Sequence, residues 1–438
     1  MKRRLRSVDG SYSCTSDVFE PDRYRQIFSI GAQEKIAVQG GGISYAATSF
    51  GGSARVINMR RFDRLLDFDP DRAIVEAEAG ITVGRLHTFL AKHGFTVAVQ
   101  PGHPQISLGG CIAANVHGKS HFREGLFADL VEQVRLFHPA RGELTLSHEQ
   151  HRELLELTCG GFGLTGIILS ARIRIVPLAG NCFDVRHIPV SNLADTVARF
   201  NELKEDHDLL YSWNDLARFD RHMGRGKIVA GRLVERNPAP TPPRHYRRLD
   251  PHRKSIARVG IIRPATLRAL NALYYFATRS ARPSFLDLNR ALFPGAYKSY
   301  YFGAYGGAGF LEHQILVPDS QISTYLEEFE TLVRRHRQRF GLTALKLFRG
   351  NQKLLRYDGC GVNFSLHLAN RPKSLALLED LDALNIRNGV ITNLVKDSRL
   401  SAATARLQYP EFELFARRLA EFDPSRLFVT ALSSRLKI

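Results

Sequence analysis

Residues Pro101 to Lys119 read PGHPQISLGGCIAANVHGK. The stretch contains no acidic residue and is rich in small ones, namely Ser107, Gly109, Gly110, Ala113 and Ala114. A backbone without bulky side chains can lie against a ligand at van der Waals distance and can direct its N–H groups at an anion. We therefore predict that this stretch forms part of a ligand-binding surface.

Two further glycine runs lie on either side of this stretch. GGGISY occupies residues 40–45, after the short apolar stretch Lys35–Val38, and GGFGLTG occupies residues 160–166. A strand followed by a glycine loop is the order that a phosphate-binding loop needs, although the first run alone would equally suit a glycine-rich hairpin. Three such runs together indicate one large ligand with phosphates and a flat ring system.

The pattern of the first half predicts a mixed sheet and not a dinucleotide fold of the Rossmann type. Val56–Met59, Leu65–Phe68 and Ala73–Ala79 are expected strands, and a helix capped by Thr82 should end at Gly94. The strands and helices do not alternate steadily, and the acidic residue expected about 20 positions after the first loop is missing. The predicted fold class is α+β.

Composition limits the possible partners and organisation. A chain of 438 residues should form two or three domains, and 61 Lys and Arg against 43 Asp and Glu favour an anionic partner. No nucleic-acid-binding motif supports nucleic acid as that partner. The five cysteines are scattered without a CxxC pair, so neither a disulfide framework nor a metal site is expected.

The sequence also bears on location. The start, MKRRLR, is basic but leads to no apolar segment, and no apolar run approaches the ~18 residues of a membrane helix. We expect a cytoplasmic protein, with peripheral association at the inner membrane face left open. Residues 236–258 are rich in Pro, Arg, Lys and His and form either a solvated linker or a lid that meets lipid phosphate. The oligomeric state cannot be predicted.

Four short motifs accompany the glycine runs. They are the stretch at 101–119 with VHGK at 116–119, GFLEHQ at 309–314, KDSR at 396–399 and the carboxyl end. Together these residues resemble the vanillyl-alcohol oxidase and p-cresol methylhydroxylase (PCMH-type) superfamily, whose members bind FAD. Within it they are most similar to the decaprenylphosphoryl-ribose oxidases, which act on a sugar lipid, and to the aldonolactone oxidases.

The resemblance implies a domain plan. A two-subdomain FAD-binding domain is expected at 1–178, and a substrate-binding cap at 179–390, built on an antiparallel sheet with flanking helices and carrying the basic loop. The segment 391–438 would return to the FAD-binding domain.

The resemblance also implies a set of cofactor contacts. Many members tether the flavin covalently through a histidine just before the serine of the first loop, where this chain has Ile43. FAD is therefore expected to be non-covalent. The residues implied to contact it are Gly40, Gly41, Gly42, Ile43, Ser44, Tyr45, Gly102, Ser107, Leu108, Gly109, Gly110, Ala114, Asn115, His117, Ile168 and Asn393.

The expected reaction is oxidation of a secondary alcohol of a sugar or sugar lipid, with hydride leaving to the flavin N5. Lys396 is the predicted base or hydroxyl-orienting group, and Lys119 is predicted to reach into the substrate pocket. Tyr45, Gln314 and Trp213 are the predicted substrate contacts. An aldonolactone oxidase and a flavin-containing lipid-phosphate-binding protein without alcohol oxidation are the alternatives.

Two details of the predicted pocket concern strands of the cap. Along Gly309–Val317, Glu312 and Gln314 should face one side of the sheet, while Leu311 and His313 face the other. Some members of the resembling family carry a pocket cysteine near the position of Gly361. A glycine there, with Cys360 pointing away, argues against a reactive thiol in this pocket.

Overall fold

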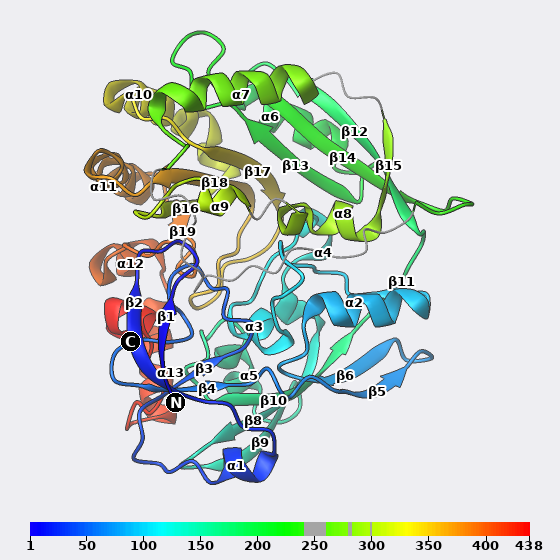
Figure 1. The fold of residues 1–438 in the computed structure, drawn as a ribbon, viewed down its shortest axis with the longest axis vertical. Helices are drawn as coiled ribbons and strands as arrows, with labels where there is room; N and C mark the ends of the chain where they lie inside the picture. The colour runs from blue at the N-terminus through cyan, green and yellow to red at the C-terminus, as the bar shows by residue number, and fades with distance from the viewer. Residues whose placement is uncertain (241–259, 279–282, 298–299) are drawn as a thin grey trace.

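A computed structural model describes residues 1–240, 260–278, 283–297 and 300–438. Its helices and antiparallel sheets confirm the α+β class. Figure 1 shows two halves, one containing both chain termini and the other lying at the opposite end of the molecule. Of the basic loop predicted at 236–258, residues 241–258 lie outside the described residues. No helix in the described parts of the chain combines the length and apolar character that crossing a membrane requires.

The half with the termini contains two main sheets. The first has the order β1-β2-β4-β3, in which β2, β4 and β3 run parallel, and the second has the antiparallel order β5-β6-β10-β8-β9. The strands are β1 (Lys2–Arg6), β2 (Ser13–Phe19), β3 (Ile36–Gln39), β4 (Arg55–Asn58), β5 (Leu65–Asp69), β6 (Ile74–Glu78), β8 (Val131–His138), β9 (Gly142–Ser147) and β10 (Ile167–Arg174), with β7 (Phe95–Thr96) pairing β11 (Val176–Pro177).

Short helices connect these strands. Thr82 begins the longest of them as predicted, because its Oγ1 accepts a hydrogen bond from the Arg85 N–H. The helices are α1 (Tyr24–Phe28), α2 (Val83–Lys92), α3 (Leu108–Ala113), α4 (His121–Glu124), η1 (Phe127–Leu130) and α5 (Arg152–Thr158). The strand β7 that follows α2 is short and ends at Thr96.

The other half is built on two antiparallel four-stranded sheets, with the orders β13-β14-β12-β15 and β17-β18-β16-β19. The strands are β12 (Cys182–Val190), β13 (Leu209–Asn214), β14 (Gly226–Val234), β15 (Ser284–Asp287), β16 (Phe310–Pro318), β17 (Leu342–Phe348), β18 (Gly361–Ala369) and β19 (Ile391–Thr392). The Leu345 N–H donates to Ser212 Oγ at 3.2 Å, which links β17 to β13 across the two sheets.

Longer helices pack on these sheets. They bury one apolar face, as in α10, where Tyr325, Phe329 and Val333 are all buried. The helices of this half are α6 (Leu193–Leu203), α7 (Pro264–Thr278), α8 (Leu288–Leu292), η2 (Pro294–Tyr297), α9 (Tyr300–Gly303), η3 (Asp319–Gln321), α10 (Ile322–His336) and α11 (Pro372–Arg387).

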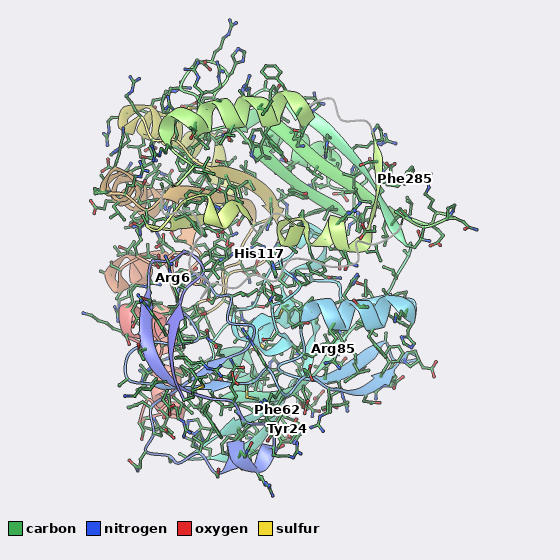
Figure 2. The ribbon with its side chains drawn as sticks, viewed as in Figure 1. Arg6, Tyr24, Phe62, Arg85, His117 and Phe285 are labelled. Atoms are coloured by element: carbon green, nitrogen blue, oxygen red, sulfur yellow. The ribbon has the colours of Figure 1, made fainter. Side chains whose placement is uncertain are left out.

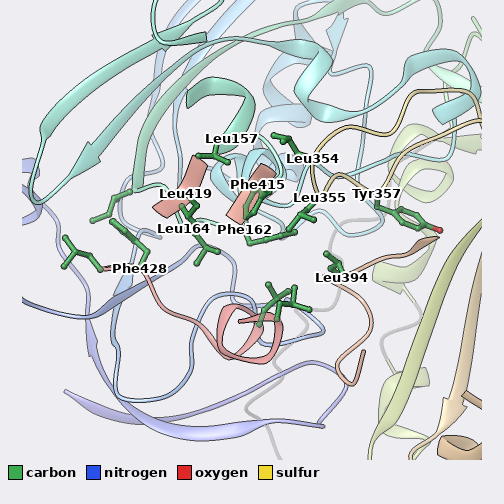
Figure 3. Close-up of a cluster of buried hydrophobic side chains, with 14 of the residues drawn as sticks. Leu157, Phe162, Leu164, Leu354, Leu355, Tyr357, Leu394, Phe415, Leu419 and Phe428 are labelled. Atoms are coloured by element: carbon green, nitrogen blue, oxygen red, sulfur yellow. The ribbon is translucent and has the colours of Figure 1, made fainter. Parts of the chain in front are cut away.

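The carboxyl-terminal helices pack against the first half of the chain. These helices are α12 (Ala402–Gln408), α13 (Phe412–Phe422) and α14 (Ala431–Leu436). Figure 3 shows Phe162 and Leu164 in one buried cluster with Phe415 and Phe428. The backbone also crosses between them, since the Ile36 N–H donates to the Leu427 carbonyl at 2.8 Å. The division at residues 178 and 390 stays a prediction.

Candidate active site

The first glycine loop follows β3 and lies directly on the stretch that precedes α3. A side-chain carbon at Gly40 would lie 2.0 Å from Ser107 Oγ, and one at Gly41 would lie 2.4 Å from the Gln105 carbonyl oxygen. Contacts this short leave no room for any residue larger than glycine. The loop therefore needs its glycines in order to pack against the residues 105–107.

The backbone polarity of this loop is suited to an anion. Among the hydrogen bonds of the described residues, none comes from the N–H groups of residues 40–44. The carbonyls point elsewhere, because Arg60 donates to the Gly40 oxygen at 3.2 Å and to the Gly41 oxygen at 2.6 Å. A run of available N–H groups is a binding site for phosphate oxygens.

The stretch at 101–119 differs in part from the expectation. Ser107 begins α3, and its Oγ accepts from the Gly110 N–H at 3.2 Å. The N–H groups of Leu108 and Gly109 donate at 2.8 Å to the carbonyls of Ile81 and Ala79, so they are not available to an anion. The small residues in this turn instead allow α3 to pack closely on the segment that follows β6.

The other predicted cofactor contacts lie around this turn. Asn115 has a positive φ of 42°, its Oδ1 accepts from the Ala128 N–H at 2.8 Å, and its buried Nδ2 has no hydrogen-bond partner among the described residues. Gly102 has open space where a side chain would stand, and Ile168 is buried on β10. Ala114 ends α3. An unpartnered amide at Asn115 is a donor that a bound ligand can use.

The sheet β17-β18-β16 presents a polar face opposite its apolar core. Leu311, Ile315 and Val317 pack in that core, so Glu312 and Gln314 project to the other side, as the alternation predicted. In the strand register, Gln314 lies beside Ser365 and Glu312 beside His367. Lys346 of β17 shares this face, because it pairs with Asn363.

Gln314 links the two halves of the molecule. Its Nε2 lies 3.0 Å from Ser365 Oγ and 3.2 Å from His117 Nε2, and its Oε1 accepts from Asn393 Nδ2 at 2.6 Å. Figure 2 shows His117 where the two halves meet. The structure thus joins three residues, His117, Gln314 and Asn393, that the sequence assigned to the site from distant segments.

His117 has a defined protonation state in this network. Its Nδ1 lies 3.1 Å from the Gly118 carbonyl oxygen, which can only accept, so Nδ1 carries the proton and Nε2 accepts from Gln314. Burial, together with the charge of Lys346, holds the pKa of His117 well below its usual range. His117 is therefore a neutral, fixed hydrogen-bonding group.

Lys396 lies between an aromatic ring and a buried carboxylate. Its Nζ is 3.6 Å from the centroid of the Tyr45 ring and 3.5 Å from Glu312 Oε2. Burial acts to raise the pKa of Glu312, but the charges of Lys396 and His367 outweigh it and bring that pKa to about 2. The site thus holds an ionised Glu312 that pairs with Lys396.

Two further lysines lie in the same region. The Lys119 Nζ donates to the Leu292 carbonyl of α8, and burial with the nearby charge of Lys346 lowers the pKa of Lys119 to about 7. Burial and the charge of Lys396 lower the pKa of Lys346 to about 8. Sequence reasoning missed Lys346. One signal could have found it. Lys346 is the charged residue in the largely apolar strand LTALKLF, at a position where alternation turns its side chain to one face of the sheet.

Trp213 and the cap cysteines are placed differently from the other predicted residues. The indole of Trp213 packs on Tyr274 of α7, with ring centroids 4.8 Å apart. Cys360 is exposed, and a side-chain carbon at Gly361 would lie 2.1 Å from the Val317 carbonyl oxygen. Gly361 therefore has no space for a side chain, and Ser365 is the residue of β18 that reaches Gln314.

Comparison with known proteins agrees with this geometry. Residues 30–147 match the family described as FAD binding domain. This chain is an FAD-dependent oxidoreductase with a PCMH-type domain. The relatives that it matches are named as oxidases and dehydrogenases.

The oxidoreductase is similar to three such relatives. It is 27% identical to decaprenylphosphoryl-beta-D-ribose oxidase of Mycolicibacterium smegmatis, over 92% of this chain and 89% of that protein. It is 28% identical to L-galactono-1,4-lactone dehydrogenase 2, mitochondrial, of Oryza sativa subsp. japonica, over 42% of this chain and 31% of that protein. Against L-gulonolactone oxidase of Scyliorhinus torazame, identity is 26% over 38% of this chain and 39% of that protein.

Proposed function

We propose that the oxidoreductase binds FAD non-covalently and oxidises a secondary alcohol of a sugar that carries a phosphate or lipid-phosphate group, as a decaprenylphosphoryl-ribose oxidase does. The observation that carries the proposal is the convergence of Lys119, Lys346 and Lys396 around the polar face of the cap sheet. These cations exceed the charge of Glu312, which favours an anionic substrate.

The extent of the similarities also supports a sugar-lipid substrate. An alignment that covers 92% of the chain must include most of residues 179–390, where the substrate is expected to bind. The two lactone-enzyme alignments cover 42% and 38% of the chain. An aldonolactone oxidase therefore remains the alternative, with weaker support from the cap.

The residues present suit FAD. The free N–H groups of residues 40–44 would hold its pyrophosphate, and Asn115 and His117 lie nearby to contact the rest of the cofactor. When bound, FAD supplies a flavin ring that accepts a hydride from the alcohol carbon. The protein's own contribution is to hold the substrate and move its hydroxyl proton.

The polar face of the cap offers groups for both tasks. Gln314 is fixed by Ser365 and Asn393, so it can orient a sugar hydroxyl with little loss of freedom. Lys396 is held by Glu312 and Tyr45, where it can orient the reacting hydroxyl or take its proton. Lys119 and Lys346 would neutralise the anionic group of the substrate.

Acid precipitation of the yellow protein should release all of the flavin into the supernatant. Ile43 stands where a tethering histidine would be, and its hydrocarbon side chain cannot form a bond to the flavin ring. The absorbance of supernatant and pellet measures the outcome. Flavin that stays with the precipitated protein would refute non-covalent binding.

Gly41→Ala should abolish FAD retention, because its methyl group would stand 2.4 Å from the Gln105 carbonyl and force the loop away from residues 105–107. Gly31→Ala is the matched control, since a side-chain carbon there has open space within 4 Å. The flavin-to-protein absorbance ratio after gel filtration should fall to near zero for the first variant only. Equal ratios would show that the loop does not hold the cofactor.

The substrate class can be tested by anaerobic flavin bleaching with polyprenyl-phospho-pentoses, aldonolactones and free sugars. Lysines with pKa values lowered to about 7 and 8 are charged below those values, so an anionic substrate should bind more weakly as the pH rises through 7–8. A neutral lactone should show no such trend. Bleaching by lactones alone would favour the aldonolactone oxidase, and binding without bleaching would favour a lipid-phosphate-binding protein.

A further inference from the structure

Only the first residue of the KDSR motif at 396–399, Lys396, has a role in the proposed reaction. Lys396 lies beside Glu312 on the polar face of the cap sheet. Asp397 instead contacts His313, whose side chain projects to the opposite face of the same strand, β16. Successive residues of the motif therefore reach both faces of the sheet, and the charged residues on the far face need an explanation of their own.

Asp397 holds the backbone of the turn that carries Lys396. Its side chain is buried, and its Oδ1 accepts from the N–H groups of Arg399 and Leu400, both at 2.8 Å. On the other side of the turn, the N–H groups of Lys396 and Asp397 both donate to the Asn393 carbonyl at 3.0 Å. The backbone is thus hydrogen-bonded both before and after the Asp397 side chain, and Lys396 lies between these two sets of bonds.

A network of charged residues holds the Asp397 carboxylate in turn. Its Oδ2 accepts from His313 Nδ1 at 2.9 Å and lies 3.2 Å from Arg399 Nη2. The Arg399 guanidinium also binds Asp382 of α11 through two nitrogens, at 2.5 and 2.9 Å. Burial acts to raise the pKa of Asp397, but the charge of Arg399 and the hydrogen bond from His313 outweigh it and hold that pKa well below its usual range. The carboxylate is therefore ionised, and β16 and α11 together set its orientation.

We propose that Asp397 is a positioning residue, which together with Arg399 and His313 fixes the turn that presents Lys396 to the substrate hydroxyl. A group on a long side chain has a defined position only if its backbone is held, and a displacement of about 1 Å can lower a rate about 10²-fold. Stability alone does not call for this network, because well-packed apolar residues often stabilise a fold as much as a buried ion pair does. The proposal rests on the function proposed for Lys396 and extends it from one residue to the motif.

Asp397→Asn in the FAD-loaded full chain tests the proposal. Asparagine has the same shape and can still accept from the turn, but its NH₂ group would face the donors of His313 and Arg399. Flavin bleaching at saturating substrate should slow about 10²-fold. The same substitution made in the Lys396→Met variant should change the rate by less than about twofold, because Asp397 then has no reactive group to position.

A second readout does not depend on turnover. Acetylation by acetic anhydride, followed by mass spectrometry, compares the accessibility of Lys396 with that of Lys353, whose side chain is 43% exposed. Asp397→Asn should release Lys396 from Glu312 and so raise its acetylation rate relative to that of Lys353.

Asp423→Asn is the matched control for both readouts. Asp423 is also buried, its Oδ2 accepts from the Leu427 N–H at 2.6 Å, and its Oδ1 lies 3.7 Å from Nε2 of the buried His138. It therefore has the same kinds of partner as Asp397, but it lies among the carboxyl-terminal helices that pack on the first half of the chain. Asp423→Asn should change neither the bleaching rate nor the acetylation of Lys396.

Three results would overturn the proposal: an unchanged bleaching rate in Asp397→Asn, a loss of the same factor with and without Lys396, or unchanged acetylation of Lys396. If Asp397→Asn loses FAD, Arg399→Lys repeats the test with a smaller expected loss of rate, since lysine keeps the charge but lacks the guanidinium fork. If no substrate bleaches the unmodified protein, the proposed function fails, and the acetylation of Lys396 alone decides whether Asp397 holds it in place.

Discussion

Replacing Lys396 with methionine should slow flavin reduction by substrate about 10²–10⁴-fold while FAD stays bound, the range expected for loss of a general base. The Lys396 Nζ is held 3.5 Å from Glu312 Oε2 and over the Tyr45 ring, so its ammonium or amine has a fixed position. Methionine keeps most of the side-chain volume and removes the amino group, which orients the hydroxyl as an ammonium or takes its proton as a neutral amine. Stopped-flow bleaching under anaerobic conditions measures this reductive step separately from reoxidation.

Two comparisons make the Lys396 experiment specific. Lys396→Arg should not restore the rate, because a guanidinium stays protonated and has a different shape. Lys119→Met should mainly raise the substrate concentration needed for half-maximal rate, as expected for a positioning contact. If FAD-loaded Lys396→Met bleaches at the normal rate, Lys396 takes no part in the chemistry. If that variant loses FAD and stability together, its role is structural.

The sequence predicted those features of the site that depend on local backbone chemistry. Glycine runs at 40–45 and 101–119 indicated backbone that a ligand can approach closely, and the distances from Gly40 and Gly41 to the residues 105–107 show that these glycines also pack on the protein itself. Alternation along β16 placed Glu312 and Gln314 on one face correctly. Such patterns are readable because they follow from the geometry of one strand or one turn.

Features that depend on pairing between distant strands could not be predicted. Lys346 joins the site only because β17 pairs with β18 so that Lys346 lies beside Asn363, and nothing local to LTALKLF fixes that register. The same register places Ser365, and not Gly361, next to Gln314. The hydrogen bonds of the Leu108 and Gly109 N–H groups could likewise not be predicted, because the carbonyls that accept them come from a preceding segment.

The carboxylate of Glu312 is expected to dominate the electrostatic stability of the site. It is buried, and its Oε2 lies 3.5 Å from Lys396 Nζ and 3.3 Å from His367 Nε2. Glu312→Gln removes the negative charge but leaves the partly exposed Lys396 beside it. Breaking a fully buried ion pair in this way costs about 3–5 kcal/mol, because the remaining charge is desolvated without compensation, and the partial exposure of Lys396 lowers that cost. Lys346 adds to that cost, since its charge also lowers the pKa of Glu312.

The effect of Glu312→Gln should depend on pH with a definite sign. The pKa of Glu312 is about 2 in the folded protein against an ordinary value of 4.5, so its ionised form contributes stability above pH 4.5 that is lost as the pH falls from 4.5 towards 2. The difference in unfolding free energy between the unmodified protein and the variant should therefore be largest near pH 7 and smaller at pH 3.5. Urea unfolding at both pH values, with FAD in excess, measures it.

A surface ion pair gives the control for the Glu312 experiment. Glu328 pairs with Arg387 at 3.0 Å, but both side chains are exposed, so Glu328→Gln should change the unfolding free energy by about 1 kcal/mol or less at either pH. A Glu312→Gln variant that behaves like Glu328→Gln would mean that Glu312 is already neutral or well solvated. In that case Lys396 would lack the charged partner that fixes its position. The Tyr45 ring alone would then have to hold Lys396 in place for orienting the hydroxyl.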